Sequence, residues 1–424
     1  MAMDNIDNNN NEVINKAQRA KIASLPLSLL SAEEKNEALA SIAALLAEKS
    51  DTILIANEQD VQKGKKFGMS QAILDRLSLS AKRVADMVAG VRQVVGLEDP
   101  VGEVLSHAVR PNGLVIDKIR VPLGVIGMIY EARPNVTVDS VSLALKTGNA
   151  IILRGSSSAL ASNKALVAVI HEALTKTKVS VDAVQLIESV DHHAVMQMMK
   201  LNQYLDVLIP RGGADLIRNV LENSTVPVLE TGVGNCHVFI DESADPAMAI
   251  PLTVNAKTHR PAVCNAAETL LIHKDWGKDN ILAVLKALRD QGVELRVCSG
   301  LHELRPDLLL ATEEDWGTEF LALVMAVKLV DNVDEAIRHI NCYGTKHTEA
   351  IVTQNQQNAV RFMCMVDAAA VNYNASTRFT DGFEYGFGAE IGISTQKLHA
   401  RGPMGLPELT SYKYLVYGNG QIRK

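Results

Sequence analysis

The sequence of 424 residues lacks several features that would assign it to familiar structural classes. It has five cysteines, an odd number, and no C-x-x-C pair. A disulfide framework or a structural metal site is therefore poorly supported, and reduced thiols in a reducing compartment are the simplest interpretation. The apolar stretches are short and broken, and the N-terminal region has no signal-peptide pattern. We expect a cytoplasmic protein that binds neither membrane nor metal.

Long runs of one charge are also missing. The 42 basic and 49 acidic residues give a formal net charge of −7, which repels the nucleic acid backbone and anionic membranes alike. We therefore expect no nucleic acid partner. Hydrophobic residues make up 47% of the chain, enough for large cores, and the length favours two domains.

The first part of the chain predicts helices and then a hairpin. An Asn run ends at Asn11, and residues 1–11 are expected to form a disordered tail. Ser31 followed by Glu34 is a capping-box pattern, and apolar residues then recur at helical spacing. The pattern changes from about Val104, and Asn112-Gly113 lies between the extended segments 109–110 and 114–121, which is a strong hairpin signal.

Strands and helices then alternate. Short apolar runs suited to buried strands are expected at 124–130, 150–153, 184–187, 206–209 and 226–229, with helices at 139–146, 163–175 and 214–223. This order predicts an α/β fold with a parallel sheet whose ligands lie at the carboxyl ends of the strands. A polar stretch at 241–251 marks a domain boundary, and a second α/β unit is expected from 251 to 370.

Cys264 is the first candidate for chemistry. It follows Lys257, His259 and Arg260, whose positive potential would favour the nucleophilic thiolate. The alternative interpretation is a buried structural cysteine, because neighbours in sequence are not always neighbours in space.

Two further patterns lie where strands are expected to end. Glu230 follows the run 226–229, where a carboxylate could serve as a base or contact a cofactor; a solvated glutamate before a turn is the alternative. Gly212 and Gly213 stand between a strand and a helix, where a backbone can approach phosphates. No G-x-G-x-x-G fingerprint occurs in the chain, so the glycines alone are a weak signal.

The order of several segments resembles the aldehyde dehydrogenase superfamily. The segment PLGVIGMIYEARPN (122–135) is similar to the stretch that ends in its oxyanion-hole asparagine, which places that role on Asn135. The segment GNAIILR (148–154) is similar to a strand ending in a basic residue that holds the adenosine ribose, here Arg154. Glu230 and Cys264 resemble the family's glutamate and nucleophile, and Glu319 in TEF (318–320) its nicotinamide-ribose contact.

Within that superfamily the resemblance is to the γ-glutamyl phosphate reductase branch. It is carried by segments at 254–269, 343–349, 374–382, 386–395 and 399–405, namely VNAKTHRPAVCNAAET, YGTKHTE, NASTRFTDG, GFGAEIGIST and HARGPMG. Some positions depart from the branch: His259 replaces an expected Gln, Ala262 a Ser or other small residue, and a Ser triplet beginning at Ser156 an expected Gly-Ser-Glu. The triplet removes a carboxylate that would repel a 2′-phosphate, which is compatible with NADP.

The resemblance implies an NADPH-dependent oxidoreductase of proline biosynthesis. Its expected reaction reduces L-glutamyl 5-phosphate to L-glutamate 5-semialdehyde through a thioester on Cys264, with Asn135 stabilising the oxyanion. Ser156, Gly212 and Gly213 join Arg154 and Glu319 as expected cofactor contacts.

The substrate carries a carboxylate, an ammonium and a phosphate, so cationic and anionic partners are both required. Because guanidinium groups pair with such anions, we expect anion binding from Arg260, Arg378, Arg133 and Arg401. Asp381 or Glu349 could bind the ammonium. For each of these residues, a structural or surface ion pair is the alternative.

The family fold implies a discontinuous architecture. A Rossmann-type NADP-binding domain is expected at 12–105 and 120–245, a catalytic domain at 246–380, and a β-hairpin oligomerisation arm at 106–119 and 400–424. Such an arm predicts a homodimer or larger homo-oligomer, and functional coupling to glutamate 5-kinase is possible.

Three alternatives remain open. The chain could be a hydrolytic aldehyde dehydrogenase, an acyl-CoA reductase, or a non-catalytic binding protein on the same fold. The presence of Cys264, Asn135 and Glu230 together disfavours the last of these, because packing alone does not require all three.

Overall fold

The structure is a computed structural model that describes residues 2–423, without the side chains of residues 2–11 and 72. The chain divides into two compact units. Unit 1 contains Met1–Glu230, Gly386–Ile391 and Met404–Lys424, and unit 2 contains Thr231–Tyr385 and Gly392–Pro403. Within the described range, no helix combines the length and the apolar character needed to cross a membrane.

Unit 1 is built on a four-stranded parallel sheet in the order β5-β4-β3-β6. Every residue of the central strand β3 is buried, as the continuous apolar run predicted. The strands are β3 (Val125–Tyr130), β4 (Ala150–Gly155), β5 (Val184–Leu186) and β6 (Val207–Arg211).

Nine helices belong to the described part of unit 1. The predicted capping box is confirmed at the start of α2, where Ser31 accepts from the Glu34 amide and the Glu34 carboxylate accepts from the Ser31 amide. The helices are α1 (Ala2–Ser28), α2 (Ala32–Glu48), α3 (Ser50–Lys66), α4 (Gln71–Leu77), α5 (Ala81–Gly96), α6 (Asn135–Lys146), α7 (Leu160–Leu174), α8 (His192–Met198) and α9 (Ala214–Asn223).

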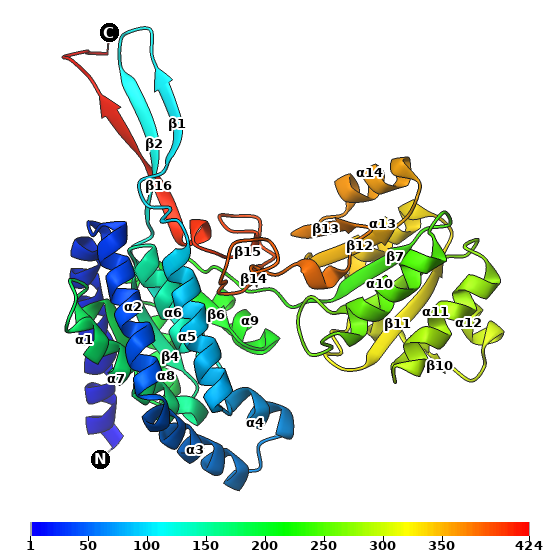
Figure 1. The fold of residues 1–424 in the computed structure, drawn as a ribbon, viewed down its shortest axis with the longest axis horizontal. Helices are drawn as coiled ribbons and strands as arrows, with labels where there is room; N and C mark the ends of the chain where they lie inside the picture. Colours follow the sequence, from blue (N-terminus) through cyan, green and yellow to red (C-terminus); the bar gives the residue numbers. More distant parts are fainter. Residues whose placement is uncertain (1, 424) are drawn as a thin grey trace. The chain divides into compact units, whose positions relative to one another are not determined.

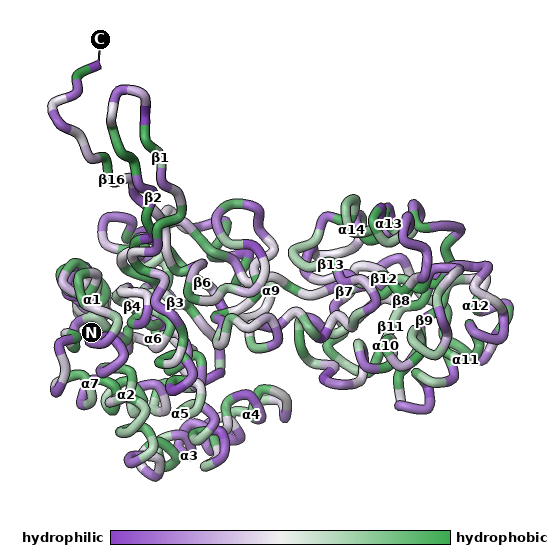
Figure 2. The backbone as a smooth tube through the Cα atoms, turned by 45° about the horizontal axis from the view of Figure 1, so that its top comes forward, coloured by the Kyte–Doolittle hydropathy of each residue, from purple (hydrophilic) through white to green (hydrophobic). Residues whose placement is uncertain are grey.

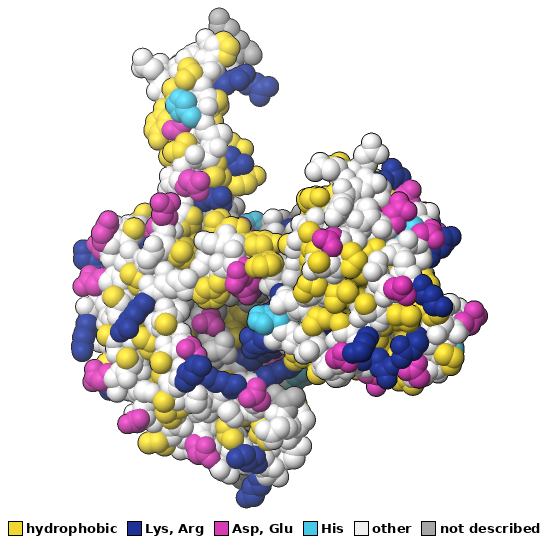
Figure 3. Space-filling model, turned by 45° about the vertical axis from the view of Figure 1, so that its right-hand side comes forward, with side chains coloured by type: hydrophobic (Ala, Val, Ile, Leu, Met, Phe, Trp, Pro, Cys, Tyr) yellow, Lys and Arg dark blue, Asp and Glu magenta, His cyan; other side chains and the backbone are white. Residues whose placement is uncertain are grey.

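The predicted hairpin forms two strands of a small antiparallel sheet. Strand β1 (Val104–Val109) pairs with β2 (Val115–Pro122), and β2 pairs with the C-terminal strand β16 (Thr410–Tyr417). We call this three-stranded sheet the arm (Figure 1). Hydrophobic side chains lie on its surface in the view of Figure 3, and every residue of β1 is exposed.

Unit 2 is built on a seven-stranded sheet in the order β10-β9-β11-β8-β7-β12-β13, with every pairing parallel. Strands β14 and β15 form a separate two-stranded antiparallel sheet. The strands are β7 (Cys236–Ile240), β8 (Ala267–His273), β9 (Glu294–Val297), β10 (Leu309–Leu310), β11 (Val324–Val330), β12 (Thr348–Val352), β13 (Ala370–Tyr373), β14 (Ile393–Ser394) and β15 (Gly402–Pro403).

The seven-stranded sheet has a hydrophobic core on each face. Alternate strand residues point to opposite faces, so Val238 and Ile240 of β7 join one core while Phe239 joins the other. Figure 2 shows the hydrophobic colour along β8 and β11. The first core is covered by α10 (Pro246–Thr258), α11 (Lys278–Asp290) and α12 (Ser299–Leu304), and the second by α13 (Val333–Tyr343) and α14 (Gln356–Met365).

Two expectations about local structure were wrong. The backbone of residues 2–11, expected to be a disordered tail, continues α1, because each residue added to an existing helix gains a hydrogen bond at little further cost. The expected strand at 226–229 is a single bridge between Leu208 and Val228. Pro227 has no N–H and cannot extend the ladder, although its carbonyl accepts from Leu208.

The unit boundary also differs from the expected one. It lies between Glu230 and Thr231, ahead of β7, whereas the polar stretch at 241–251 is internal to unit 2. That stretch is the start of α10: Asp245 caps the helix and Pro246 occupies its first turn. Residues 400–403, which we had assigned to the arm, also belong to unit 2.

Candidate active site

Cys264 lies in the turn that connects α10 to β8 in unit 2. Its side chain is partly exposed and its thiol is not in a disulfide. The carboxyl-terminal end of a helix and the start of a parallel strand flank it, so the position of the thiol depends on the backbone of this turn rather than on a regular element.

The segment 234–236 supports the backbone of this turn. A Cβ on Gly234 would lie 1.5 Å from the Cys264 carbonyl oxygen, so the two backbones are in direct contact. The Cys236 thiol, which is fully buried, donates to the same carbonyl oxygen at 3.1 Å. The Gly234 amide donates to Glu319 at 2.7 Å, so the expected ribose contact also holds the segment beneath the thiol.

The structure brings four of the predicted residues together in unit 2. Arg378 interacts electrostatically with Arg260, Asp381 and the Cys264 thiol. Burial, and then the charge of Arg260, lower the pKa of Arg378, whereas Asp381 and Cys264 act in the opposite direction. Two guanidinium groups and a carboxylate thus accompany the thiol, as a substrate with both anionic and cationic groups requires.

His259 belongs to the same cluster. The Nε of Arg378 donates to the Nδ1 of His259 over 3.4 Å, which requires that this ring nitrogen be unprotonated. The His259 ring is exposed. The residue that departs from the expected Gln is therefore a neighbour of an expected substrate arginine.

Asn265 connects the thiol turn to the loop that carries Arg378. Its buried side-chain amide donates to the Thr380 carbonyl at 2.9 Å. The sequence analysis did not identify Asn265 as a site residue. Its place directly after the nucleophile was a signal, but the distant partner became visible only in the fold.

Lys257, one of the three basic residues before the thiol in sequence, is paired inside unit 2. Its side chain is fully buried and forms an ion pair with Glu268 of β8, and burial lowers its pKa. Burial also raises the pKa of Glu268, to about 7. The Lys257 ammonium is thus held beside Glu268, because α10 directs this side chain into the interior of unit 2.

Two other expected substrate contacts are engaged elsewhere. Glu349 is completely buried and accepts from the backbone amide of His237 at 2.7 Å, so it does not face a substrate. Burial raises its pKa. Arg401 donates to Asp367 at 2.7 Å and forms an ion pair with it.

Unit 1 contains the other predicted residues. Asn135 opens α6, is exposed, and donates through Nδ2 to Asp139 at 3.0 Å. Burial raises the pKa of Asp139 to about 6, while Asn135 and the charge of Arg211 oppose that shift. Arg133 lies between β3 and α6, and Glu230 is the last residue of the unit before the chain enters unit 2.

The end of β4 offers an arginine suited to a polar ligand. Arg154 donates to the Gly155 carbonyl at 2.7 Å, and burial lowers its pKa. Its buried Nε has no hydrogen-bond partner within the described chain, which fits a role in holding a ligand oxygen. Ser156 follows the last residue of β4. Its hydroxyl accepts from the Ser158 amide and so caps a short helical turn.

Gly212 and Gly213 contact a carboxylate of the chain itself. The Gly213 amide donates to Glu131 at 3.2 Å, and a Cβ on Gly212 would lie 2.7 Å from the Glu131 carboxyl carbon. A carboxylate at the N-terminus of α9 is favourable for the same reason that a phosphate is. A cofactor phosphate at this amide would therefore have to displace Glu131.

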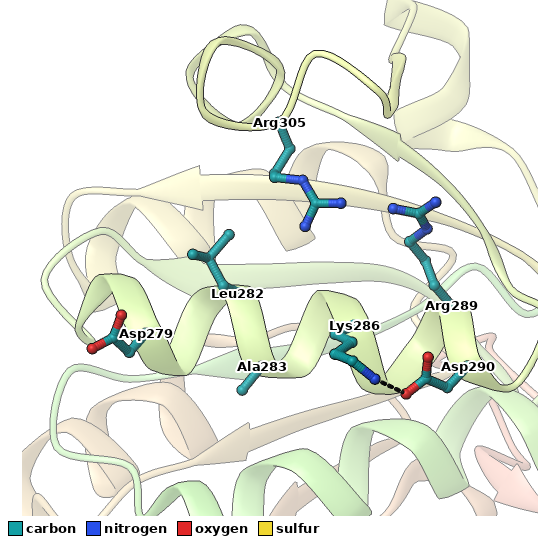
Figure 4. Close-up of a pocket in the computed structure, with 7 residues that line it drawn as sticks. All are labelled: Asp279, Leu282, Ala283, Lys286, Arg289, Asp290 and Arg305. Atoms are coloured by element: carbon teal, nitrogen blue, oxygen red, sulfur yellow. Dashed lines mark hydrogen bonds and ion pairs between the residues drawn. The ribbon is translucent and has the colours of Figure 1, made fainter.

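A surface hollow of about 600 Å³ in unit 2 contains none of the predicted residues. It lies along α11, with Arg289 and Arg305 on one side and the Lys286–Asp290 ion pair on the other (Figure 4). Both arginines bind Asp307, so their charge is partly neutralised. The chemistry of the chain is therefore expected at Cys264 and not at this hollow.

Comparison with known proteins agrees with this geometry. The profile of the aldehyde dehydrogenase family matches residues 3–302. The chain belongs to this family. Membership implies a nicotinamide cofactor, and the end of β4 with Arg154 is compatible with one.

Individual relatives within the family are similar along almost the whole chain. A γ-glutamyl phosphate reductase of Bacillus cereus (strain AH187) is 56% identical over 414 residues, covering 98% of this chain and 100% of the relative. The corresponding protein of Geobacillus thermodenitrificans is 59% identical over 413 residues, covering 97% and 99%. The solved γ-glutamyl phosphate reductase of Thermotoga maritima has a TM-score of 0.96 at 52% identity, covering 97% and 100%.

More distant members share the fold. An acetylating aldehyde dehydrogenase of Geobacillus thermoglucosidasius aligns with a TM-score of 0.70 at 17% identity, covering 98% of each chain. The expected aldehyde-dehydrogenase-like α/β fold is therefore confirmed.

Proposed function

We propose that the chain reduces L-glutamyl 5-phosphate to L-glutamate 5-semialdehyde with release of phosphate, using NADPH, in the second step of proline biosynthesis from glutamate. The observation that carries the proposal is the cluster of Arg260, Arg378 and Asp381 with the Cys264 thiol. The whole-length identity with γ-glutamyl phosphate reductases supports the same substrate. A cytoplasmic location and coupling to glutamate 5-kinase remain predictions.

Cys264 performs the covalent step. Its thiolate attacks the γ-acyl carbon of the acyl phosphate, the carbon–oxygen bond to phosphate breaks, and a thioester on Cys264 remains. The contact with Gly234 and the Cys236 hydrogen bond hold the Cys264 carbonyl, and so fix the backbone from which the thiol projects. A fixed nucleophile needs less reorganisation at the moment of attack.

The negative charge that develops on the carbonyl oxygen requires fixed donors. Asn135 supplies a side-chain N–H and Cys264 its backbone N–H, and the loss of one such donor typically costs about 3–4 kcal/mol of barrier. Asn135 is exposed at the start of its helix, where its second N–H can meet a ligand.

Arg260 and Arg378 bind the anionic groups of the substrate. Arg378 interacts electrostatically with both Arg260 and the Cys264 thiol, and the guanidinium fork matches phosphate or carboxylate. Asp381 binds the ammonium group, and Arg133 is a further candidate for anion binding. Arg378 is half-buried, which strengthens its interaction with an anion relative to a fully solvated arginine.

A bound nicotinamide cofactor supplies the hydride that converts the thioester to the aldehyde. Arg154 and Ser156 would hold its adenosine end, and Glu319 would hold its nicotinamide ribose. Gly212 and Gly213 can contact the cofactor only if the Glu131 carboxylate, which accepts from the Gly213 amide, moves away. Glu230 is part of the site, and the chain must keep water from the thioester because hydrolysis would waste it.

The test is the reverse reaction of the purified protein. Glutamate 5-semialdehyde is supplied with NADP or NAD, with and without phosphate, and the reduced cofactor is followed by its ultraviolet absorbance. We expect NADPH to form only when phosphate is present and Cys264 is intact. Cys264→Ala should abolish turnover, whereas Cys342→Ala, which removes an exposed thiol on α13, should leave it unchanged.

Each alternative predicts a different outcome. Turnover that ignores phosphate would indicate a hydrolytic aldehyde dehydrogenase, and turnover that requires coenzyme A an acyl-CoA reductase. Full activity of Cys264→Ala would exclude the thioester mechanism.

A further inference from the structure

Asn135 has an unusual environment for the first residue of a helix. The N-cap of α6 is Pro134, which has no side-chain acceptor for the free backbone amides of the first turn. The Asn135 carboxamide instead donates to Asp139, one helical turn further on, at 3.0 Å. The acceptor is therefore supplied from the same face of the same helix.

The identity of this acceptor decides the orientation of the carboxamide. An ionised carboxylate accepts hydrogen bonds and cannot donate, so the amide must turn its NH₂ group and not its oxygen toward Asp139. One N–H of Asn135 is bound in this way, and the second N–H is left for another acceptor. A neutral neighbour able to donate would permit the flipped amide, which presents oxygen where a donor is needed.

The carboxylate is placed where it is costly to ionise. Asp139 is half-buried on α6, and burial raises its pKa to about 6. The charged group that faces it is Arg211, at the end of β6, which favours the ionised form. Carboxyl groups with strongly perturbed pKa values gather at functional sites.

We propose that Asp139 is a positioning residue for catalysis: its carboxylate binds one N–H of the Asn135 carboxamide, so that the amide presents its second N–H and not its oxygen to a ligand. The inference rests on the proposed function, in which Asn135 is the oxyanion donor. Asp139 itself touches neither substrate nor cofactor in this scheme, so its effect must pass through Asn135.

A double-mutant cycle in the full-length protein separates this role from a structural one. In the phosphate-dependent assay, Asn135→Ala should lower kcat by about 10²- to 10³-fold. Asp139→Ala should lower kcat by about 10- to 100-fold, with KM within about twofold, as is typical when a supporting partner is lost. The double variant should be no slower than Asn135→Ala alone, because there is then no carboxamide to orient.

Three results would overturn the inference: a normal kcat for Asp139→Ala, a multiplicative loss in the double variant, or a loss confined to KM. Asp86→Ala, which removes an exposed aspartate from α5, is the matched control and should retain wild-type kcat. If Asp139→Ala fails to fold, Asp139→Asn is the variant to measure. The new carboxamide has the shape of the carboxylate but can turn a donor toward Asn135. A severalfold loss of kcat supports the inference and a wild-type kcat rejects it.

Failure of the proposed function gives a different pattern. If Cys264→Ala is fully active, the reaction assignment falls. If Cys264 is essential and Asn135→Ala is slow while Asp139→Ala is normal, the reaction stands and the role of Asp139 alone is rejected.

Discussion

Gly234 packs directly against the backbone of the turn that carries Cys264. Its position cannot accept a Cβ, which would lie 1.5 Å from the Cys264 carbonyl oxygen. We predict that Gly234→Ala loses most of its reductase activity, because the turn must shift and carry the thiol with it. Steady-state kinetics and thermal unfolding of the variant test this.

Gly90 provides the matched control. It lies within α5 with open space where a Cβ would stand. Gly90→Ala should keep full activity and gain about 0.5–1 kcal/mol of stability, since alanine favours a helix interior. A fully active Gly234→Ala would contradict the role of the 234–236 segment.

Asp139 also predicts a pH dependence of stability. Its pKa in the fold, about 6, lies above the ordinary 3.8, so folding favours the protonated form. The stabilisation from the protonated group is complete below the ordinary pKa and is lost as the pH rises through about 6. Asp139→Asn, which stays neutral, should therefore gain stability relative to wild type at pH above 6.

Urea unfolding of both proteins at several pH values from below 4 to above 7 measures this difference. A gap between variant and wild type that does not grow with pH would show that burial does not raise the pKa of Asp139. Increased stability with reduced kcat would indicate that this carboxylate is retained for function.

For some residues the surroundings in the fold could be predicted from the sequence, and for others they could not. Arg378 and Asp381 were expected to bind the charged groups of the substrate, and in the fold Arg378 interacts electrostatically with Asp381 and Cys264. The pairing of Lys257 with Glu268 was not foreseen, because it depends on how α10 turns this side chain inward. Asp139 was overlooked, although the spacing of four from Asn135 was a visible signal.

The ion pair of Lys257 and Glu268 joins two elements of unit 2. It links α10 to β8, the elements on either side of the thiol turn, and both side chains are fully buried. We predict that Lys257→Met lowers the free energy of unfolding by about 3–5 kcal/mol, because it leaves a buried carboxylate without a partner.

Glu268→Leu in the same chain should recover much of that loss, since replacing both charges by apolar groups removes the unpaired carboxylate. Lys286→Met, which breaks the exposed Lys286–Asp290 pair on α11, is the control and should change stability little. Equal effects of the two single substitutions in denaturant unfolding would contradict the prediction.

Most elements could be predicted because their hydrophobic patterns are local. The buried run of β3, the capping box of α2 and the Asn-Gly hairpin each follow from a few adjacent residues. The segment 226–229 was misassigned because strand formation needs a partner, and Pro227 prevents an extended ladder with β6.

For the whole molecule, the arm predicts self-association. Its outer strand β1 is exposed throughout, and Val109 is 65% exposed. Apolar edge strands of a small sheet tend to pair with other chains. We predict that Val109→Asp shifts the protein toward a smaller assembly without changing its helical content.

Light scattering after size-exclusion chromatography measures the assembly, and circular dichroism the helical content. Ile55→Asp on α3 is the control, because Ile55 is also 65% exposed but lies outside the arm. An unchanged mass for Val109→Asp would show that this edge is not an interface.

The sequence by itself determined the composition class, most strands and helices, and the family. These follow from periodicity, turn residues and ordered motifs, which are properties of adjacent residues. Only the tertiary structure decided that Gly234 and Cys236 support the thiol turn, that Lys257 and Glu349 are buried in ion pairs or hydrogen bonds, and that the units divide before β7. The reason is that each of these depends on contacts between segments far apart in the chain, and strand order and burial set them.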